Sequence, residues 1–358
     1  MSALRSNSVA AAVVVVTVVI GGLVAHFARA GNDRDTDLER ALTTLPSSTL
    51  VANFTDWAGA RTADGHHTGP DSTTRAKRRF LDRAYARDFS ALSVLSVFTS
   101  TMQTSYGWSV LDSQWEMYGQ SKAGSVDVLS MSADFDFTRA AHRLDKLGYP
   151  KPDGHGVRAG GVSVEVTAGL TPQLGNIALL PEDGLIVLSD DPGYAGRTVS
   201  TIRGDRSSVL DEPGVADMAR HTARRAVAAV VDVGHRACVS AGRSTAGAGA
   251  RRRAAERVSE AGGIHRINGL TLALAPTGSL WVVMHFPSES QARADVTARK
   301  HLAHGAAPVQ GGTFDERFSV HHVAVDGANL TMRLEPKQSH RQLLSDLQRG
   351  GLLFAGCS

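Results

Sequence analysis

The sequence predicts an α+β protein, with one N-terminal transmembrane helix followed by two similar α+β lobes. Each lobe is expected to have an antiparallel-rich sheet with helices on one face, in a ferredoxin-like or related topology. Three observations lead to this prediction. Residues 9–27 form an uninterrupted apolar run, hairpin-like pairs of strands alternate with capped helices, and the order of these elements repeats in the second half of the chain.

The apolar run at residues 9–27 (VAAAVVVVTVVIGGLVAHF) contains no Asp, Glu, Lys or Arg. A helix needs about 20 apolar residues to cross a bilayer. Only helices and closed barrels satisfy their own backbone hydrogen bonds in hydrocarbon, which outweighs the modest helix preference of Val in water. The run therefore predicts a transmembrane helix or signal sequence, preceded by a cytoplasmic head at residues 1–8.

The residues that flank this segment orient it only weakly, because Arg5 precedes it while Arg29 and Arg34 follow it. Residues 1–8 are too few to form a domain, so we expect a signal anchor with the C-terminal part outside the cytoplasm. A second interpretation stays open. The small residues Ala28 and Ala30 fit a signal-peptidase site, and cleavage near Ala30 would release a secreted protein.

The composition is that of globular protein, with 42% apolar residues, 20% charged residues and a formal net charge of +3. The polar residues 28–45 are expected to form a stalk between the membrane and the fold. Two basic clusters, at residues 75–79 and 251–253, lie in helix-like sequence without interleaved aromatic residues. We interpret them as solvated helix faces, and we expect no nucleic-acid partner.

The first lobe is predicted at residues 46–205. Its elements in order are a strand at 49–55, helical sequence at 71–98, a hairpin at 115–131, a helix at 136–147, a hairpin at 176–188 and a helix at 192–203. Asp136 is the expected N-cap of the middle helix and Gly148 its C-terminal stop.

The second lobe is predicted at residues 206–358 and repeats this order. Its elements are a helix at 215–226, a strand at 227–233, helical sequence at 251–260, a hairpin at 270–286, a helix at 289–304, a hairpin at 320–334, a helix at 339–349 and a final strand at 352–355. Ser288 and Gln291 indicate a capping box for the central helix. The common order predicts an internal duplication.

The two cysteines, Cys238 and Cys357, both follow the apolar run. Disulfides persist in oxidising compartments, so we predict that these cysteines pair. The bridge would close about 119 residues and stabilise the fold by about 4–5 kcal/mol, an upper-end figure of the chain-entropy model. Two buried free thiols are the alternative.

No catalytic, cofactor-binding or metal-binding motif stands out, so no cofactor or metal is expected. The pair His66 and His67 lacks the ligand spacing of known metal sites. If the protein is an enzyme with a dispersed site, His66, His67 or His235 would be the base. Asp56 and Trp57 end the first predicted strand and are a candidate surface contact, because indole rings suit interfaces.

Four stretches carry a resemblance to a known group. They are residues 45–57 (LPSSTLVANFTDW), 115–120 (WEMYGQ), 343–347 (LLSDL) and 353–357 (LFAGC). In these stretches the chain resembles uncharacterised actinobacterial membrane-anchored proteins. The resemblance implies an N-terminal membrane segment and cysteines near position 238 and at the C-terminus, which agrees with the predicted disulfide. It implies no activity, substrate or catalytic residue.

These observations favour a membrane-anchored, extracytoplasmic protein of the bacterial cell envelope that binds an unknown envelope protein or ligand without catalysis. The predicted duplication would leave a cleft between the lobes, and clefts are common binding sites. The alternative is an exported hydrolase with a dispersed active site in that cleft. A third interpretation, carriage of an apolar ligand between the lobes, requires a large apolar cavity.

Overall fold

The computed structural model describes residues 36–65, 68–160, 170–222, 226–241 and 247–357. The predicted transmembrane helix at residues 9–27 lies outside these ranges. Within them, no helix combines the length and the hydropathy that a membrane span requires.

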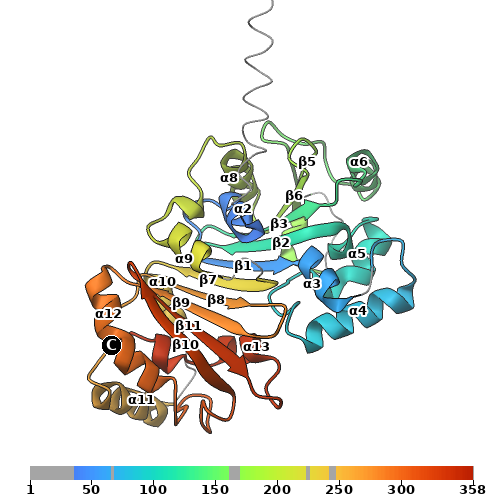
Figure 1. Cartoon of the computed structure of the whole chain (residues 1–358). Helices are drawn as coiled ribbons and strands as arrows, with labels where there is room; N and C mark the ends of the chain where they lie inside the picture. The colour runs from blue at the N-terminus through green and yellow to red at the C-terminus, as the bar shows by residue number, and fades with distance from the viewer. Residues whose placement is uncertain (1–35, 66–67, 161–169, 223–225, 242–246, 358) are drawn as a thin grey trace, which may run out of the picture. The chain divides into compact units, whose positions relative to one another are not determined.

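The described residues contain eleven strands. They are β1 (Val51–Asp56), β2 (Ser113–Gln120), β3 (Ser125–Met131), β4 (Val157–Ala159), β5 (Asn176–Leu180), β6 (Leu185–Ser189), β7 (Ala228–Val233), β8 (Gly269–Leu274), β9 (Leu280–His285), β10 (Phe318–Asp326) and β11 (Asn329–Pro336). All of them join one sheet, in the order β10-β11-β9-β8-β7-β1-β2-β3-β6-β5-β4. Helices pack against this sheet (Figure 1), so the α+β class is confirmed.

The α-helices are α2 (Asp37–Thr43), α3 (Trp57–Asp64), α4 (Thr74–Ala86), α5 (Thr99–Ser105), α6 (Phe137–Lys146), α8 (Pro192–Ile202), α9 (Val215–His221), α10 (His235–Ala241), α11 (Ala248–Glu260), α12 (Glu289–Leu302) and α13 (Leu343–Arg349). Short 3-10 helices are η1 (Ser96–Phe98), η2 (Val110–Asp112), η3 (Pro172–Gly175), η4 (Val209–Asp211) and η5 (Leu353–Ala355). The predicted N-caps are present, since the side chains of Asp136 and Ser288 accept from the backbone amides of Arg139 and Gln291. The capping box predicted at Ser288 is incomplete, because Oε1 of Gln291 has no hydrogen-bond partner among the described residues.

The sheet has the same strand order on both sides of its central pair. Reading outward, the first half runs β1-β2-β3-β6-β5 and the second runs β7-β8-β9-β11-β10, and the first half ends in one additional edge strand, β4. The two halves meet where β1 pairs antiparallel with β7, from Val51 opposite Asp232 to Thr55 opposite Ala228. Because an antiparallel pair looks alike from either end, this junction lets two similar halves extend one continuous sheet in opposite directions.

Helices cover both faces of the sheet, so the prediction of helices on one face is wrong. One core gathers side chains from α2, α8 and α9, and the other gathers side chains from α3–α6, α10, α12 and α13. Successive residues of β6 alternate between the two cores, with Ile186 in one and Val187 in the other. A strand that is apolar at every position, rather than at every second one, is buried on both faces.

Three further expectations are corrected. The stalk predicted at residues 28–45 does not extend through α2, because this helix buries Leu38, Ala41 and Leu42 in one of the cores. In a ferredoxin-like sheet, a split βαβ unit places a third strand between two parallel strands, whereas here β1, β2 and β3 are consecutive neighbours that pair antiparallel. The final strand predicted at residues 352–355 is instead the 3-10 helix η5. The backbone there bonds locally, from the Ala355 amide to the Leu352 carbonyl, and the Phe354 carbonyl accepts from the buried side chain of Arg299.

Candidate functional site

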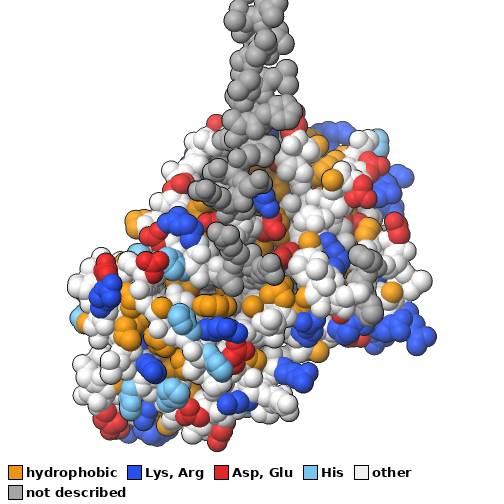
Figure 2. Space-filling view, viewed as in Figure 1, with side chains coloured by type: hydrophobic (Ala, Val, Ile, Leu, Met, Phe, Trp, Pro, Cys, Tyr) orange, Lys and Arg blue, Asp and Glu red, His pale blue; other side chains and the backbone are white. Residues whose placement is uncertain are grey.

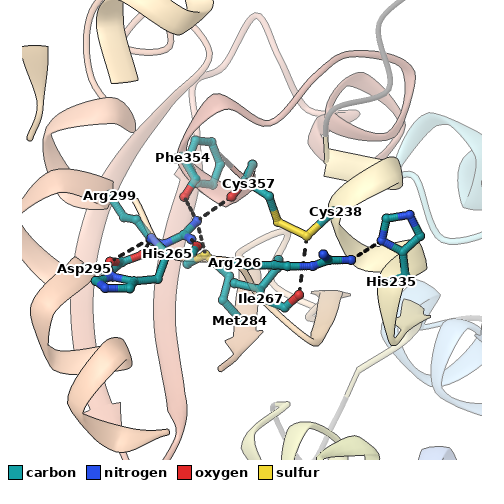
Figure 3. The surroundings of a disulfide bond; sticks show 11 residues. His235, Cys238, His265, Arg266, Ile267, Met284, Asp295, Arg299, Phe354 and Cys357 are labelled. Carbon is teal, nitrogen blue, oxygen red and sulfur yellow. Dashed lines mark hydrogen bonds and ion pairs between the residues drawn. A yellow bond between two sulfur atoms is a disulfide. The ribbon is translucent and has the colours of Figure 1, made fainter. Parts of the chain in front are cut away.

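Cys238 and Cys357 form a disulfide, as predicted, with 5.4 Å between their Cα atoms and 119 residues between them in sequence. Cys238 lies on α10, directly after the central strand β7, and Cys357 follows η5 near the C-terminus. The bridge therefore fastens the C-terminal segment to the middle of the sheet. Figure 3 shows it together with the polar side chains on either side.

Arg299 holds the same C-terminal segment from the other side (Figure 3). Its guanidinium is fully buried and donates to the carbonyl oxygens of Phe354 at 2.8 Å and Gly356 at 3.1 Å, and to that of His265 at 2.6 Å. Asp295 accepts from Nε of Arg299 at 2.8 Å and supplies the counter-charge. Burial lowers the pKa of Arg299, and the carboxylate of Asp295 opposes that shift. The group is an ion pair that clamps the backbone beside Cys357.

An apolar pocket with a volume of about 560 Å³ lies next to the bridge. We call it the C-terminal pocket. It is lined by Arg251, Ala254, Ala255, Val258 and Ser259 of α11, by Gly263, Ile264 and Val309, and by Gly351, Leu352, Leu353, Gly356 and Cys357 of the C-terminal segment. Small-molecule sites typically have volumes of about 300–1,000 Å³ and mostly apolar walls with a few polar groups, so this pocket has the size and lining of a ligand site.

The wall that α11 contributes is held loosely. None of the 13 residues of α11 is buried, although Val258 packs partly against the core. Arg257 of the same helix donates from Nη2 to the carbonyl of His304 at 3.1 Å, which fixes α11 to the end of α12. The helix thus presents Ala254 and Ala255 to the pocket, where their short side chains leave space. The disulfide and Arg299 fix the opposite wall.

A second cavity of about 570 Å³ lies beside α6. Exposed charged residues of both signs surround it, including Asp136, Arg139 and Arg143. Exposed charged side chains are solvated by water, so this cavity is a weaker candidate for a ligand site.

The sequence predicts a surface contact at Asp56 and Trp57. This prediction is wrong for Trp57, because its side chain is buried. Trp57 is 0% exposed, and its Nε1 donates to Oε2 of Glu116 at 2.9 Å. Asp56 is partly buried and caps α3 by accepting from the amide of Gly59 at 2.7 Å. Burial raises the pKa of Asp56 to about 6, and the Gly59 amide opposes this rise. The strand-to-helix turn buries the indole against the sheet, which the pattern of residues 49–57 does not reveal.

Among the candidate bases, His66 and His67 lie outside the described residues. His235 is exposed at the start of α10, and its Nδ1 is hydrogen-bonded to the guanidinium of Arg266 (Figure 3). It does not line the C-terminal pocket. Within the part of the chain that the structure describes, no group of three or more His, Cys, Asp or Glu is arranged to hold a metal ion.

The predicted basic clusters both lie on helices. Figure 2 shows Lys and Arg side chains gathered along α4, which carries residues 75–79. Residues 251–253 lie on α11 and are exposed, but Arg251 also lines the C-terminal pocket. Sequence reasoning misses this pocket, because its two walls are about 100 residues apart in the chain. The small residues Ala254 and Ala255, next to the basic run at residues 251–253, are the one feature of the sequence that could have indicated this pocket.

No protein-family model and no curated protein matches this chain. A solved structure described as "Structure of crystal form I of TP0453" is similar, with a TM-score of 0.41 and 8% sequence identity, over 87% of this chain and 97% of that chain. A likeness this distant does not indicate a function.

Proposed function

We propose that the protein is a non-catalytic binding protein of the bacterial cell envelope, with residues 9–27 in the membrane and the folded part outside the cytoplasm. The observation that carries the proposal is the disulfide between Cys238 and Cys357 beside the C-terminal pocket. Disulfides are rare in cytosolic proteins and common in exported ones. The same bridge fixes one wall of a pocket that has the size of a ligand site.

The proposal includes the internal duplication that the sequence predicts. We propose that residues 46–205 and 206–358 are duplicated α+β units, and the repeated strand order on the two sides of the β1–β7 pair supports this. In that arrangement the units share one sheet, so the binding site is the C-terminal pocket of the second unit rather than a cleft between lobes. The resemblance to actinobacterial membrane-anchored proteins remains a proposal of the same kind.

Thiol labelling tests the location. Intact cells that express the chain are treated with a membrane-impermeant maleimide, with and without prior reduction, and are then separated into membrane and secreted fractions. We expect a membrane-bound protein whose thiols react only after reduction. Labelling of both thiols without reductant after cell lysis, and not in intact cells, would contradict the proposal by placing the fold in the cytoplasm.

The variant Cys238→Ser is the matched control, because it leaves the single free thiol of Cys357. We expect this thiol to react with the impermeant reagent in intact cells. A protein recovered from the medium and shortened by about 30 residues would support the alternative of cleavage near Ala30. That result would mean that the folded part is not anchored to the membrane, but it would still place the folded part outside the cytoplasm.

A photoreactive amino acid at Ala255 tests binding at the pocket. We expect irradiation of intact cells to attach an envelope component there and not at Asp82, an exposed position on the distant helix α4. Equal and unspecific labelling at both positions would contradict a binding role for the pocket.

A further inference from the structure

We propose that the C-terminal pocket binds one fatty-acyl chain of an anionic amphiphile. The chain would lie between α11 and the C-terminal segment, and the head group would lie at Arg251. This inference rests on the proposed function, because it names the ligand class of the same site.

The walls of the pocket favour an acyl chain over a sugar or a flat aromatic ring. The lining residues contain no aromatic side chain that could stack on a ring. Apart from Arg251 and Ser259, their side chains offer no hydrogen-bonding group, and aliphatic residues such as Val258, Ile264 and Leu352 make up the interior. An apolar ligand gains free energy in proportion to the apolar area that it buries, at about 25 cal/mol per Å².

Arg251 provides the charge that selects an anionic head group. It is exposed, it lines the pocket, and within the described ranges its side chain makes no hydrogen bond or ion pair. Arg252 and Arg253 follow it on the same helix. A guanidinium pairs with carboxylate or phosphate through two parallel hydrogen bonds, so it suits either head group.

Among the residues that the structure describes, no side chain fills this pocket. Ala254 and Ala255 occupy the helix positions that face it, while the Arg299 clamp and the disulfide fix the opposite wall, formed by the C-terminal segment. One wall of the site is therefore preformed, and any adjustment on binding falls to α11, none of whose residues is buried. An apolar peptide segment of another protein is the competing occupant, and the experiment below separates the two.

The experiment uses the full chain in phosphatidylcholine nanodiscs. Palmitic acid with a terminal diazirine is photo-crosslinked, and mass spectrometry locates the adducts. We expect adducts on the pocket walls, at residues 254–264 and 351–357, and we expect unlabelled palmitate to displace them. Adducts confined to the membrane segment, or spread over the surface without displacement, would overturn the proposal.

Two pairs of variants sharpen the result. Ala255→Trp fills the pocket and should reduce wall adducts at least tenfold, whereas Glu256→Trp, on the next and exposed position outside the lining, should leave them within twofold of wild type. Both sites are exposed on α11, so neither substitution disturbs the core. Equal adduct yields from the two variants would overturn the assignment of the pocket.

Arg251→Gln tests the head group, with Arg252→Gln as its control. Arg251→Gln should reduce adducts of the acid about three- to tenfold and leave adducts of a diazirine hexadecanol unchanged. Arg252→Gln should change neither. Equal losses of acid and alcohol adducts would overturn the anionic specificity. If the specificity holds, a phosphate-headed probe of the same chain length separates carboxylate from phosphate recognition.

Failure of this inference differs from failure of the proposed function. If the Ala255 photoprobe captures a protein in cells and the acyl probe leaves the walls unlabelled, the binding role stands and the acyl ligand is wrong. If thiol labelling places the fold in the cytoplasm, the envelope function fails whatever the acyl probe does.

Discussion

The indole Nε1 of Trp57 donates a hydrogen bond of 2.9 Å to Oε2 of Glu116, and both side chains are buried. Glu116 of β2 also accepts from the hydroxyl of Ser93 at 2.6 Å and from the amides of Val94 and Leu95. One buried carboxylate thus joins the first turn of α3 and the loop after α4 to the sheet. Burial raises the pKa of Glu116, and these donors oppose the rise.

Trp57→Phe should therefore destabilise the fold more than Trp108→Phe. Both indoles are buried, but Nε1 of Trp108 has no hydrogen-bond partner among the described residues. Removing the Trp57 donor leaves the buried Glu116 with one bond fewer, which costs about 1–3 kcal/mol. Urea denaturation of the two variants measures the difference, and equal losses of unfolding free energy would contradict this role of Trp57.

The substitution Asp127→Asn should stabilise the protein at neutral pH. Burial first, and then the charge of Glu116, raise the pKa of Asp127 well above its usual range, and no N–H group among the described residues donates to its carboxyl oxygens. Above about pH 4, Asp127 keeps its proton in the native state and loses it in the unfolded state. The free energy of unfolding therefore falls as the pH rises from about 4 toward the native pKa of Asp127.

Asn cannot ionise and should remove that loss. We expect Asp127→Asn to exceed wild type in unfolding free energy at pH 8, with the gain shrinking toward pH 4. Asp82→Asn, at an exposed position on α4, is the control and should leave the pH profile unchanged. A wild-type pH profile for Asp127→Asn would contradict the prediction.

Asp56 should show a similar dependence in a defined pH window. Its pKa rises to about 6 from an ordinary value of 3.8, so the native state loses up to about 3 kcal/mol of stability between pH 4 and pH 6. Asn is as good an N-cap as Asp. Thermal unfolding should therefore find Asp56→Asn more stable than wild type at pH 7, and Asp56→Ala about 1 kcal/mol less stable than Asp56→Asn.

Reduction of the disulfide should lower the free energy of unfolding by about 3–5 kcal/mol, because the bridge closes a loop of 119 residues in the unfolded chain. The double variant Cys238→Ser, Cys357→Ser should match the reduced wild type in chemical denaturation. A reductant-insensitive midpoint in the wild type would show that the bridge adds no stability.

Arg299→Lys should loosen the C-terminal segment even though it keeps the charge. A Lys ammonium cannot reproduce the planar set of bonds from Arg299 to the carbonyls of Phe354, Gly356 and His265. We therefore expect faster hydrogen exchange at residues 352–357 for Arg299→Lys. Arg299→Met should lose about 3–5 kcal/mol of stability, because the buried Asp295 then keeps only its bonds to His265 and loses the guanidinium charge. Arg293→Lys, in an exposed pair on the same helix, is the control.

Local signals predict most of the helices and hairpins. Asp136 and Ser288 cap their helices as expected, because a side-chain oxygen three residues before a free amide is a short-range feature. The turns between β2 and β3 and between β8 and β9 are also visible in the sequence. Boundaries are less accurate, and the helix predicted at 339–349 begins at Leu343.

Contacts between distant segments are predicted poorly. The placement of Trp57 depends on Glu116, 59 residues away, and the C-terminal pocket depends on α11 meeting residues 351–357. Neither pairing leaves a periodic pattern in the sequence. The apolar run at 352–355 has the composition of a strand, whereas Arg299 and the disulfide hold it as a 3-10 turn.

The α+β class, most of the hairpins and capped helices, and the pairing of the two cysteines follow from the sequence alone, because hydrophobic period, capping and cysteine count are properties of short segments or of composition. The three-dimensional packing alone establishes that the two halves share one sheet through β1 and β7, that helices cover both of its faces, and where the pocket lies. Those features depend on which surfaces meet, and that choice is made by the packing of the whole chain.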